Sequence, residues 1–453
     1  MLIEYQSWFG IAMLVSVSIC NFFCGIAIWE GLIAVSTLFA VLGIFLNIFD
    51  LNLLGLLSNR LVGLFESDLF QAIPLYVFVA SMLKKSKIAD DIFHALRILC
   101  EGLRVPQENA YLLFSLIVAP MNGSVASTAH LLNFKNDPSI SKQSLPFRFG
   151  LICSASTIGL IIPPSLVLLM MGDAMMRAHT EAMNMGLANA DGTTIVNTKD
   201  IFVASLLPGF LVFSAWVVLN FFLFKNKQHT TDEPDSDSSQ QRGLMAMAVI
   251  GCLFFGVFQG LILAVEAAAI GSALLCFYFM FLNSTDSKMA ALGEVVKESF
   301  SLAGSLLTIL FAATAFSLVF RLFETDKWIN HWILNSSHDL FHLLMIFISV
   351  GLCALMMDAF ELILVIIPIV SPGLIMLMGD AKLVATLLLL TIQISFLLTP
   401  FGYAVLIARN FSPATTMKHQ MLSVLPYVTV ILVVFICFLL IPSITHEMSF
   451  DHA

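Results

Sequence analysis

Windows of about 20 apolar residues, each long enough to cross a lipid bilayer, recur along almost the whole chain. They lie near residues 8–28, 30–50, 66–83, 143–170, 201–224, 243–259, 262–282, 299–321, 383–408 and 421–443. Two further apolar stretches, 108–134 and 340–378, carry polar residues in the middle. Only 11% of the 453 residues are charged, whereas soluble domains carry about 25%, so lipid must cover most of the surface. The sequence therefore predicts an all-α polytopic membrane protein.

Charge and motif patterns argue against several other classes of protein. The formal net charge of -9, with no basic run longer than Lys84–Lys85–Ser86–Lys87, argues against nucleic acid as a partner. No G-x-x-x-x-G-K-[ST] motif, nucleophile elbow or H-E-x-x-H spacing occurs, so neither ATP hydrolysis nor another enzyme activity is indicated. The segment Trp8–Trp29 lacks a basic start and an A-x-A cleavage site, so we expect a first membrane span rather than a signal peptide.

A polar segment, residues 228–241, has the composition of a disordered linker and divides the chain into near-equal halves, 1–227 and 242–453. Each half contains a span, an amphipathic segment, an interrupted apolar stretch and a broken span, in that order. The broken spans are 143–170, with Gly159 and Pro163–Pro164, and 383–408, with Pro400 and Gly402. A second polar stretch, 172–200, is expected to be a loop. Paired interruptions of this kind point to a secondary transporter with its site where two repeats meet.

The distribution of Lys and Arg predicts the topology. If the N-terminus is outside and both interrupted stretches are re-entrant hairpins, 15 of the 21 basic residues face the cytoplasm, as the positive-inside rule requires. The six that face outward are Arg60, Arg177, Lys199, Arg321, Lys327 and Lys382. Two full crossings in place of the hairpins would move five of the 15 outside. The sequence therefore predicts inverted repeats with about 11 spans, two re-entrant hairpins (108–134 and 340–378) and both termini in the periplasm.

The first hairpin turns at small and hydroxylated residues, and the broken span after it carries two prolines. Candidate ligands in the hairpin are Asn122, Ser124 and Ser127; those in the broken span are Thr157, Gly159 and Pro164. Proline cannot donate an amide hydrogen bond, so carbonyls one turn earlier are freed. Freed carbonyls and hydroxyls without a strong acid favour a monovalent ion such as Na⁺ over Ca²⁺ or Mg²⁺. A proline kink with small-residue helix packing is the alternative reading.

In the second half the corresponding positions are Asp358 in the hairpin and Thr399 and Gly402 in the broken span. An ionisable residue in so apolar a run is a candidate functional group, because burying it costs at least ~2.5 kcal/mol. Asp358 fits either an ion site or an N-terminal helix cap. Glu361, three residues later, fits a capping box with Asp358. Glu266 is expected to be a carboxylate in the first turn of a helix.

These motifs together resemble the large membrane subunit of tripartite ATP-independent periplasmic (TRAP) transporters, over nearly the whole chain. Ser156-Thr-Ile-Gly-Leu-Ile-Ile-Pro-Pro-Ser165 is similar to that family's G-T-I-G-x-x-I-P-P-S, and Asn122-Gly-Ser-Val-Ala-Ser127 to its G-S-S-A-A hairpin. Ala72-Ile-Pro-Leu75 and Glu266-Ala-Ala-Ala269 resemble two further segments. The run from Gln393 to Ala404 is closest to the branch labelled mannitol/chloroaromatic. Val125, Ser156 and Glu361 depart from the family's usual residues.

The resemblance implies an elevator-type carrier in the bacterial inner membrane, which imports a small organic acid with Na⁺ as the coupling ion. It also implies two protein partners, a periplasmic substrate-binding protein and a small four-helix membrane subunit, and we expect no fusion of that small subunit to this chain. Ser165, Gln393 and Ser395, which lie in the same motifs, are candidate substrate contacts. The alternative is a one-component ion-coupled carboxylate carrier, or a cation/proton antiporter of the same superfamily, which would need no binding protein.

Overall fold

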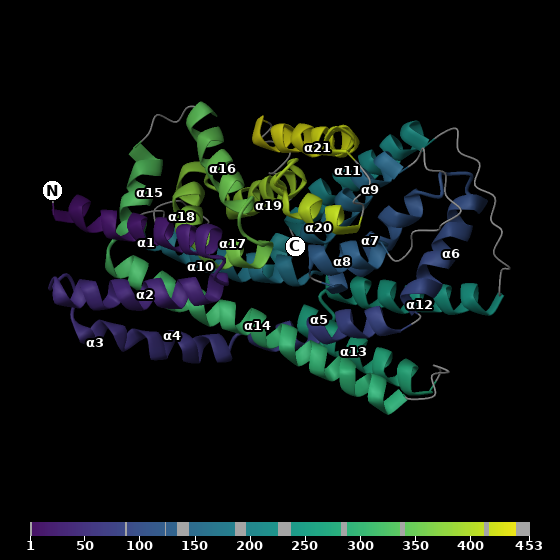
Figure 1. Cartoon of the computed structure of the whole chain (residues 1–453), viewed down its shortest axis with the longest axis horizontal. Helices are drawn as coiled ribbons and strands as arrows, with labels where there is room; N and C mark the ends of the chain where they lie inside the picture. Colours follow the sequence, from purple (N-terminus) through teal and green to yellow (C-terminus); the bar gives the residue numbers. More distant parts are fainter. Residues whose placement is uncertain are drawn as a thin grey trace.

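The computed structural model describes residues 2–86, 88–122, 124–133, 145–185, 196–224, 237–281, 288–335, 340–411 and 416–440. Helices make up nearly all of this described part, which contains no strand (Figure 1). The helices of the first half are α1 (Leu2–Cys24), α2 (Ile28–Phe45), α3 (Leu51–Leu54), α4 (Leu56–Phe65), α5 (Asp68–Lys85), α6 (Ile88–Gly102), α7 (Asn109–Asn122), α8 (Val125–Asn133), α9 (Leu145–Thr157), the 3₁₀ turn η2 (Ile158–Leu160), α10 (Leu166–Met185) and α11 (Thr198–Phe224). Those of the second half are α12 (Asp237–Phe258), α13 (Ala264–Phe281), α14 (Lys288–Leu322), α15 (Thr325–Asn335), α16 (Leu340–Ala354), α17 (Ala359–Val365), α18 (Ile367–Met378), α19 (Ala381–Leu397), α20 (Tyr403–Phe411) and α21 (Met417–Leu440).

The helices confirm an all-α membrane protein. Within the described residues, five helices are long and apolar enough to cross a membrane. Two bent pairs pass the same test, α3–α4 with α5 at 55° and α17 with α18 at 63°. Much of the apolar surface of these helices is exposed, as it must be on a protein that lipid surrounds. The expected number of about 11 spans stays a prediction.

Three boundaries differ from the sequence-based expectation. Residues 172–185 are not part of a loop, because α10 continues to Met185. Residues 237–241 belong to the first turns of α12 rather than to the linker, whose remaining residues lie outside the described part. The segment 51–65, expected to lie between two spans, forms α3 and α4, and α14 begins eleven residues before the predicted 299.

The same packing pattern occurs in both halves of the chain. Helices α5 and α14 pack against each other, with α13 on α5 and α2 on α14. The amphipathic helices α6 and α15 lie at opposite ends of the molecule (Figure 1), where α12 packs on α6 and α1 on α15. The second part of each broken span reaches the hairpin of the other half: α10 contacts α17 and α18, and α20 contacts α8. Inversion of the two halves through the membrane stays a prediction.

A buried polar network ties the base of the first hairpin to two long helices. The Asn220 side chain on α11 donates a hydrogen bond from Nδ2 to Asn109 Oδ1 on α7 at 2.9 Å. The Tyr427 hydroxyl on α21 donates to Asn220 Oδ1, and the Trp216 indole donates to the Tyr427 carbonyl at 3.1 Å. All four side chains are buried. Since buried polar groups are costly unless paired, this network specifies how α7, α11 and α21 pack.

Candidate functional site

The first break in a helix lies between α9 and α10. After Thr157 the chain forms η2 and then non-helical backbone through a cis peptide bond between Pro163 and Pro164. Ser165 ends the break by accepting a hydrogen bond from the Leu168 amide at 3.1 Å, so its hydroxyl caps α10. The whole segment is buried. Carbonyls freed by the two prolines are therefore held inside the protein, where such backbone is tolerated at membrane depth.

Gly159 brings the first hairpin into direct contact with this break. A Cβ atom added at Gly159 would lie 2.9 Å from the carbonyl carbon and oxygen of Ala119 on α7. Such a distance is shorter than real Cβ contacts, so only glycine allows the backbones of α7 and η2 to approach this closely.

The second break lies between α19 and α20 and contains a cis bond between Thr399 and Pro400. The Gly402 amide donates to the Leu398 carbonyl at 2.7 Å, and a Cβ at Gly402 would collide with the Phe396 carbonyl. One helical turn before the break, the Ser395 hydroxyl donates to the Gly351 carbonyl of α16. Both broken spans are thus packed against the first helix of their own hairpin.

The two broken spans meet at Thr157 and Gln393, both of which are fully buried. Gln393 Nε2 lies 3.3 Å from the Thr157 hydroxyl and 3.5 Å from its carbonyl, both at the long end of the hydrogen-bond range. The Thr157 hydroxyl donates to the Ser154 carbonyl at 2.8 Å. The Gln393 Oε1 atom is buried and has no partner among the described residues. The Gln393 amide therefore faces two oxygens of Thr157 with its nitrogen, and its own oxygen is left unsatisfied among the described residues.

The tips of the hairpins differ in character. In the first, the Ser127 amide lies 3.5 Å from Ser124 Oγ, and the Thr128 hydroxyl donates to the Ser124 carbonyl at 3.0 Å. Gly123 and the side chain of Asn122 lie outside the described part. In the second, Asp358 Oδ1 accepts from the Ala359 amide at 2.7 Å, and Glu361 Oε2 accepts from the Asp358 amide at 2.9 Å.

The capping interpretation of two carboxylates is confirmed. Asp358 and Glu361 form a reciprocal capping box at the start of α17. Glu266 Oε2 accepts from the Leu263 amide at 2.8 Å, which satisfies one amide at the start of α13. Asp358 combines this role with a position on a cavity wall, so capping does not exclude it from a site.

A cavity of about 370 Å³ brings the two hairpin tips together. Its wall includes Ser124 and Ser127 from the first hairpin and Asp358 from the second, with α5 and α14 on the other side. Lys84 and Glu298, joined by a 2.7 Å ion pair, also line it. We call this space the inner cavity, because Lys84 belongs to the set predicted to face the cytoplasm.

The remaining predicted residues lie elsewhere. Thr157 and Gln393 contact each other, Ser165 caps α10, and Ser395 lines an apolar pocket of about 330 Å³ beside α16 and α21. None of the three candidate substrate contacts is part of the inner-cavity wall in this conformation.

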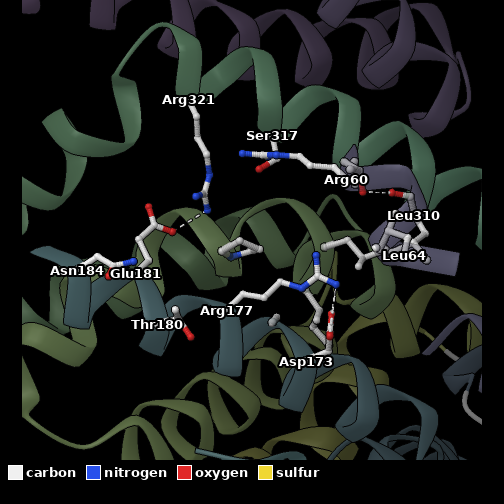
Figure 2. Close-up of a pocket in the computed structure, with 17 residues that line it drawn as sticks. Arg60, Leu64, Asp173, Arg177, Thr180, Glu181, Asn184, Leu310, Ser317 and Arg321 are labelled. Carbon is white, nitrogen blue, oxygen red and sulfur yellow. Dashed lines mark hydrogen bonds and ion pairs between the residues drawn. The ribbon is translucent and has the colours of Figure 1, made fainter. Parts of the chain in front are cut away.

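A second cavity, of about 540 Å³, lies between α4, α10, α14 and the α17–α18 segment (Figure 2). It contains Arg60, Arg177 and Arg321 with Asp173 and Glu181. Burial raises the pKa of the Glu181 carboxyl, against the attraction of Arg321. We call this space the outer cavity, since its three arginines belong to the set predicted to face outward. Sequence reasoning assigned these arginines to one side of the membrane but did not predict that they meet.

One face of α14 lines both cavities. Glu298, Leu302, Ser305 and Leu306 belong to the inner cavity, and Leu310, Ala313, Thr314, Ser317 and Arg321 to the outer cavity. On the opposite wall, Asp358 and Phe360 face the inner cavity, whereas Ile363 and Leu364 face the outer one. Short helix α17 and the apolar residues around Leu306 and Leu310 therefore separate the two spaces.

Two interrupted hairpins, two broken spans and two cavities along the same face of α14 define a multi-pass membrane transporter. The family described as "Tripartite ATP-independent periplasmic transporter, DctM component" matches residues 11–444, and the chain belongs to this family of TRAP large permease subunits. The prediction of the family is thus confirmed; the mannitol/chloroaromatic branch stays a prediction.

Curated relatives agree with this assignment, and a solved structure shares the fold. The chain is 21% identical to the sialic acid TRAP transporter large permease protein SiaM of Vibrio cholerae, over 77% of this chain and 78% of that protein. It is 22% identical to the C4-dicarboxylate TRAP transporter large permease protein DctM of Pseudomonas aeruginosa, over 86% and 88%. The crystal structure of the Alcanivorax borkumensis YdaH transporter superposes with a TM-score of 0.58 at 15% identity, covering 99% of each chain, which shows a shared fold.

Proposed function

We propose that this subunit is a Na⁺-coupled secondary transporter, which imports a small organic acid delivered by a periplasmic substrate-binding protein. The observation that carries the proposal is the contact between the two broken spans. There Gln393 Nε2 lies beside the hydroxyl and carbonyl of Thr157, and the buried Oε1 atom of the same amide has no partner among the described residues. A buried amide oxygen without a partner costs about 1–3 kcal/mol, and a bound cation would remove that cost.

The chemistry of the donors supports Na⁺ rather than a transition metal or Ca²⁺. Among the described residues, no group of three or more His, Cys, Asp or Glu side chains could hold a metal ion. Neutral oxygens from hydroxyls, amides and main-chain carbonyls suit a hard monovalent ion. We assign the first Na⁺ site to the hairpin and break around Asn122, Ser124, Ser127, Thr157, Gly159 and Pro164, with the neighbouring Gln393 Oε1 as a further ligand. We assign the second to Asp358, Thr399 and Gly402.

The two cavities support transport by alternating access. In this conformation the inner cavity contains the hairpin tips, and α17 separates it from the outer cavity. A movement of the hairpins and broken spans along α14 would carry a bound solute from one space to the other, as in an elevator-type carrier. The two named relatives carry different acids by their names, sialic acid and C4-dicarboxylates. The binding protein is accordingly the expected source of substrate choice, and a small four-helix membrane subunit the expected partner in the bacterial inner membrane.

Uptake into proteoliposomes tests the proposal. The permease is reconstituted with its small subunit, and the binding protein is added with the labelled acid that it carries. Uptake should require an inward Na⁺ gradient and should depend on Na⁺ with a Hill coefficient above one. Full uptake with choline in place of Na⁺ on both sides, at fixed pH, would refute Na⁺ coupling.

The same assay separates the alternative. A one-component carrier or antiporter would give undiminished uptake when the binding protein is left out. A strict requirement for the binding protein, combined with Na⁺ dependence, supports the tripartite mechanism.

A further inference from the structure

The charges that line the outer cavity do not balance. Arg177 is paired with Asp173 at 3.0 Å within α10. Arg321 of α14 is paired with Glu181 of α10 at 2.7 Å. Arg60 of α4 has no hydrogen-bond or ion-pair partner in the part of the chain that the structure describes. Three guanidinium groups therefore share two carboxylates.

The surroundings of Arg60 favour an additional negative charge. Its side chain is half-buried, and the like charges of Arg321 and Arg177 repel it. Glu181 attracts it, as does Asp326 of α15, which lies outside the cavity wall. Glu181 already forms an ion pair with Arg321, so its attraction is shared. Holding a partly desolvated guanidinium without a counter-ion is costly, and an anion in the cavity would offset that cost.

The shape of the cavity suits a small anion. Figure 2 shows Arg60 extending toward Ser317 of α14, with Arg177 rising from α10 across the space. The Ser317 hydroxyl also has no partner among the described residues, so a donor is free beside the guanidinium. The volume of about 540 Å³ lies within the range of about 300–1,000 Å³ that is usual for small-molecule sites.

We propose that the outer cavity is an anion-binding site, in which Arg60 receives the carboxylate of a small organic acid before the acid passes along α14. The planar fork of a guanidinium matches a carboxylate with two parallel hydrogen bonds, which a lysine ammonium cannot reproduce. Ser317 supplies a further donor from the opposite wall. This inference rests on the proposed function, because it identifies the chemical class of solute that enters the transport route.

Charge-selective labelling of a cysteine in the cavity tests the inference. Ser317→Cys is introduced after the eight native cysteines have been replaced by alanine. Spheroplasts in a Na⁺-free choline medium are treated from outside with an anionic reagent, 2-sulfonatoethyl methanethiosulfonate. A parallel sample receives its cationic counterpart, 2-(trimethylammonium)ethyl methanethiosulfonate. The ratio of the two labelling rates, divided by the same ratio for 2-mercaptoethanol, reports how strongly the cavity prefers anions.

We expect a normalised ratio well above one in the Ser317→Cys protein. Addition of Arg60→Gln should lower it about ten-fold, because removal of one charge at short range changes the two rates in opposite directions. Arg60→Lys should largely retain the preference, and Arg97→Gln on distant α6 should leave it unchanged. A ratio of one or below in the parent, an unchanged ratio in Arg60→Gln, or no labelling by either reagent from outside would overturn the inference.

The parent ratio needs no substitution at Arg60, so the test remains decisive even if Arg60→Gln does not accumulate in the membrane. The result is also independent of Na⁺ coupling, since the medium contains no Na⁺. Loss of Na⁺ dependence in uptake would refute the proposed function and leave the labelling ratio as it is. A ratio without anion preference would refute anion binding in the outer cavity, even if Na⁺-driven uptake persists.

Discussion

Thr157→Val tests whether the contact between the broken spans binds Na⁺. Valine keeps the shape of threonine and removes the hydroxyl, which donates to the Ser154 carbonyl at 2.8 Å and lies 3.3 Å from Gln393 Nε2. The loss of two such neutral contacts should cost no more than about 0.5–1.5 kcal/mol each. A contact to a charged group is worth about 1.5–3 kcal/mol. The Na⁺ concentration for half-maximal uptake should therefore rise about ten-fold or more, since 1.4 kcal/mol corresponds to a factor of ten.

Gln393→Leu tests the same contact through heat stability, which this substitution should not lower in the absence of Na⁺. Among the described residues, the amide makes only two long contacts, at 3.3 and 3.5 Å, and its buried oxygen has no partner. Leucine removes that unsatisfied oxygen, so the variant should be no less heat-stable than the wild type in Na⁺-free buffer. The stabilisation that Na⁺ confers on the wild type should fall, because an ion that binds the folded state stabilises it by RT ln(1 + [L]/Kd) and this site would no longer contribute.

The matched control is Thr391→Val on α19, whose hydroxyl donates to the Leu387 carbonyl of its own helix at 2.8 Å. Uptake is titrated with Na⁺ at constant ionic strength, and thermal unfolding is followed in Na⁺ and in choline. If Thr157→Val and Thr391→Val need the same Na⁺ concentration for half-maximal uptake, Thr157 serves packing alone. Full stabilisation of Gln393→Leu by Na⁺ would show that the ion does not bind at this contact.

Three further predictions concern packing and topology. Asn220→Leu should lower the free energy of unfolding by about 2–4 kcal/mol, measured by thermal unfolding, because it leaves two buried partners on α7 and α21 unpaired; an unchanged unfolding temperature would contradict this. Gly159→Ala should cost about 1–3 kcal/mol and slow uptake at unchanged expression, because its Cβ would lie 2.9 Å from the backbone of α7; wild-type stability and rates would show that α7 can shift freely. A single cysteine at Asn197 should react with an impermeant maleimide from outside, whereas one at Gln241 should react only after permeabilisation. Labelling of position 241 in intact spheroplasts would refute the inverted repeats.

The breaks in the helices could be predicted from the sequence because their causes are local. Pro163, Pro164 and Pro400 remove amide donors, and Gly159 and Gly402 allow close backbone contacts, so both interruptions fall where the residues indicated. The capping box of Asp358 and Glu361 is equally local, since it needs only a spacing of three. Apart from the contact of Gly159 with α7, each of these features depends on residues within one or two turns of chain.

The extent of α10 and the outer cavity could not be predicted in this way. Polar residues from 172 onward indicated a loop, yet the helix continues because Asp173 and Arg177 pair along it and Glu181 pairs with Arg321, 140 residues away. The early part of α14 also lies against a distant segment, since Glu294 pairs with Lys85 on α5. Contacts between distant segments leave no periodicity in a single sequence. The only available signal was that Arg60, Arg177 and Arg321 shared a predicted side of the membrane.

Helix α14 offers a fixed scale against which transport can be measured. The serines on its face, Ser305 in the inner cavity and Ser317 in the outer, are twelve residues apart, which is about 18 Å along the axis of a straight helix. Every turn of this helix marks about 5.4 Å of travel. Spin labels placed at intervals along α14 and one on the second hairpin would report displacement as a change in distance to known marks. These distances would give the displacement of the hairpin along α14 during transport, whichever acid is carried.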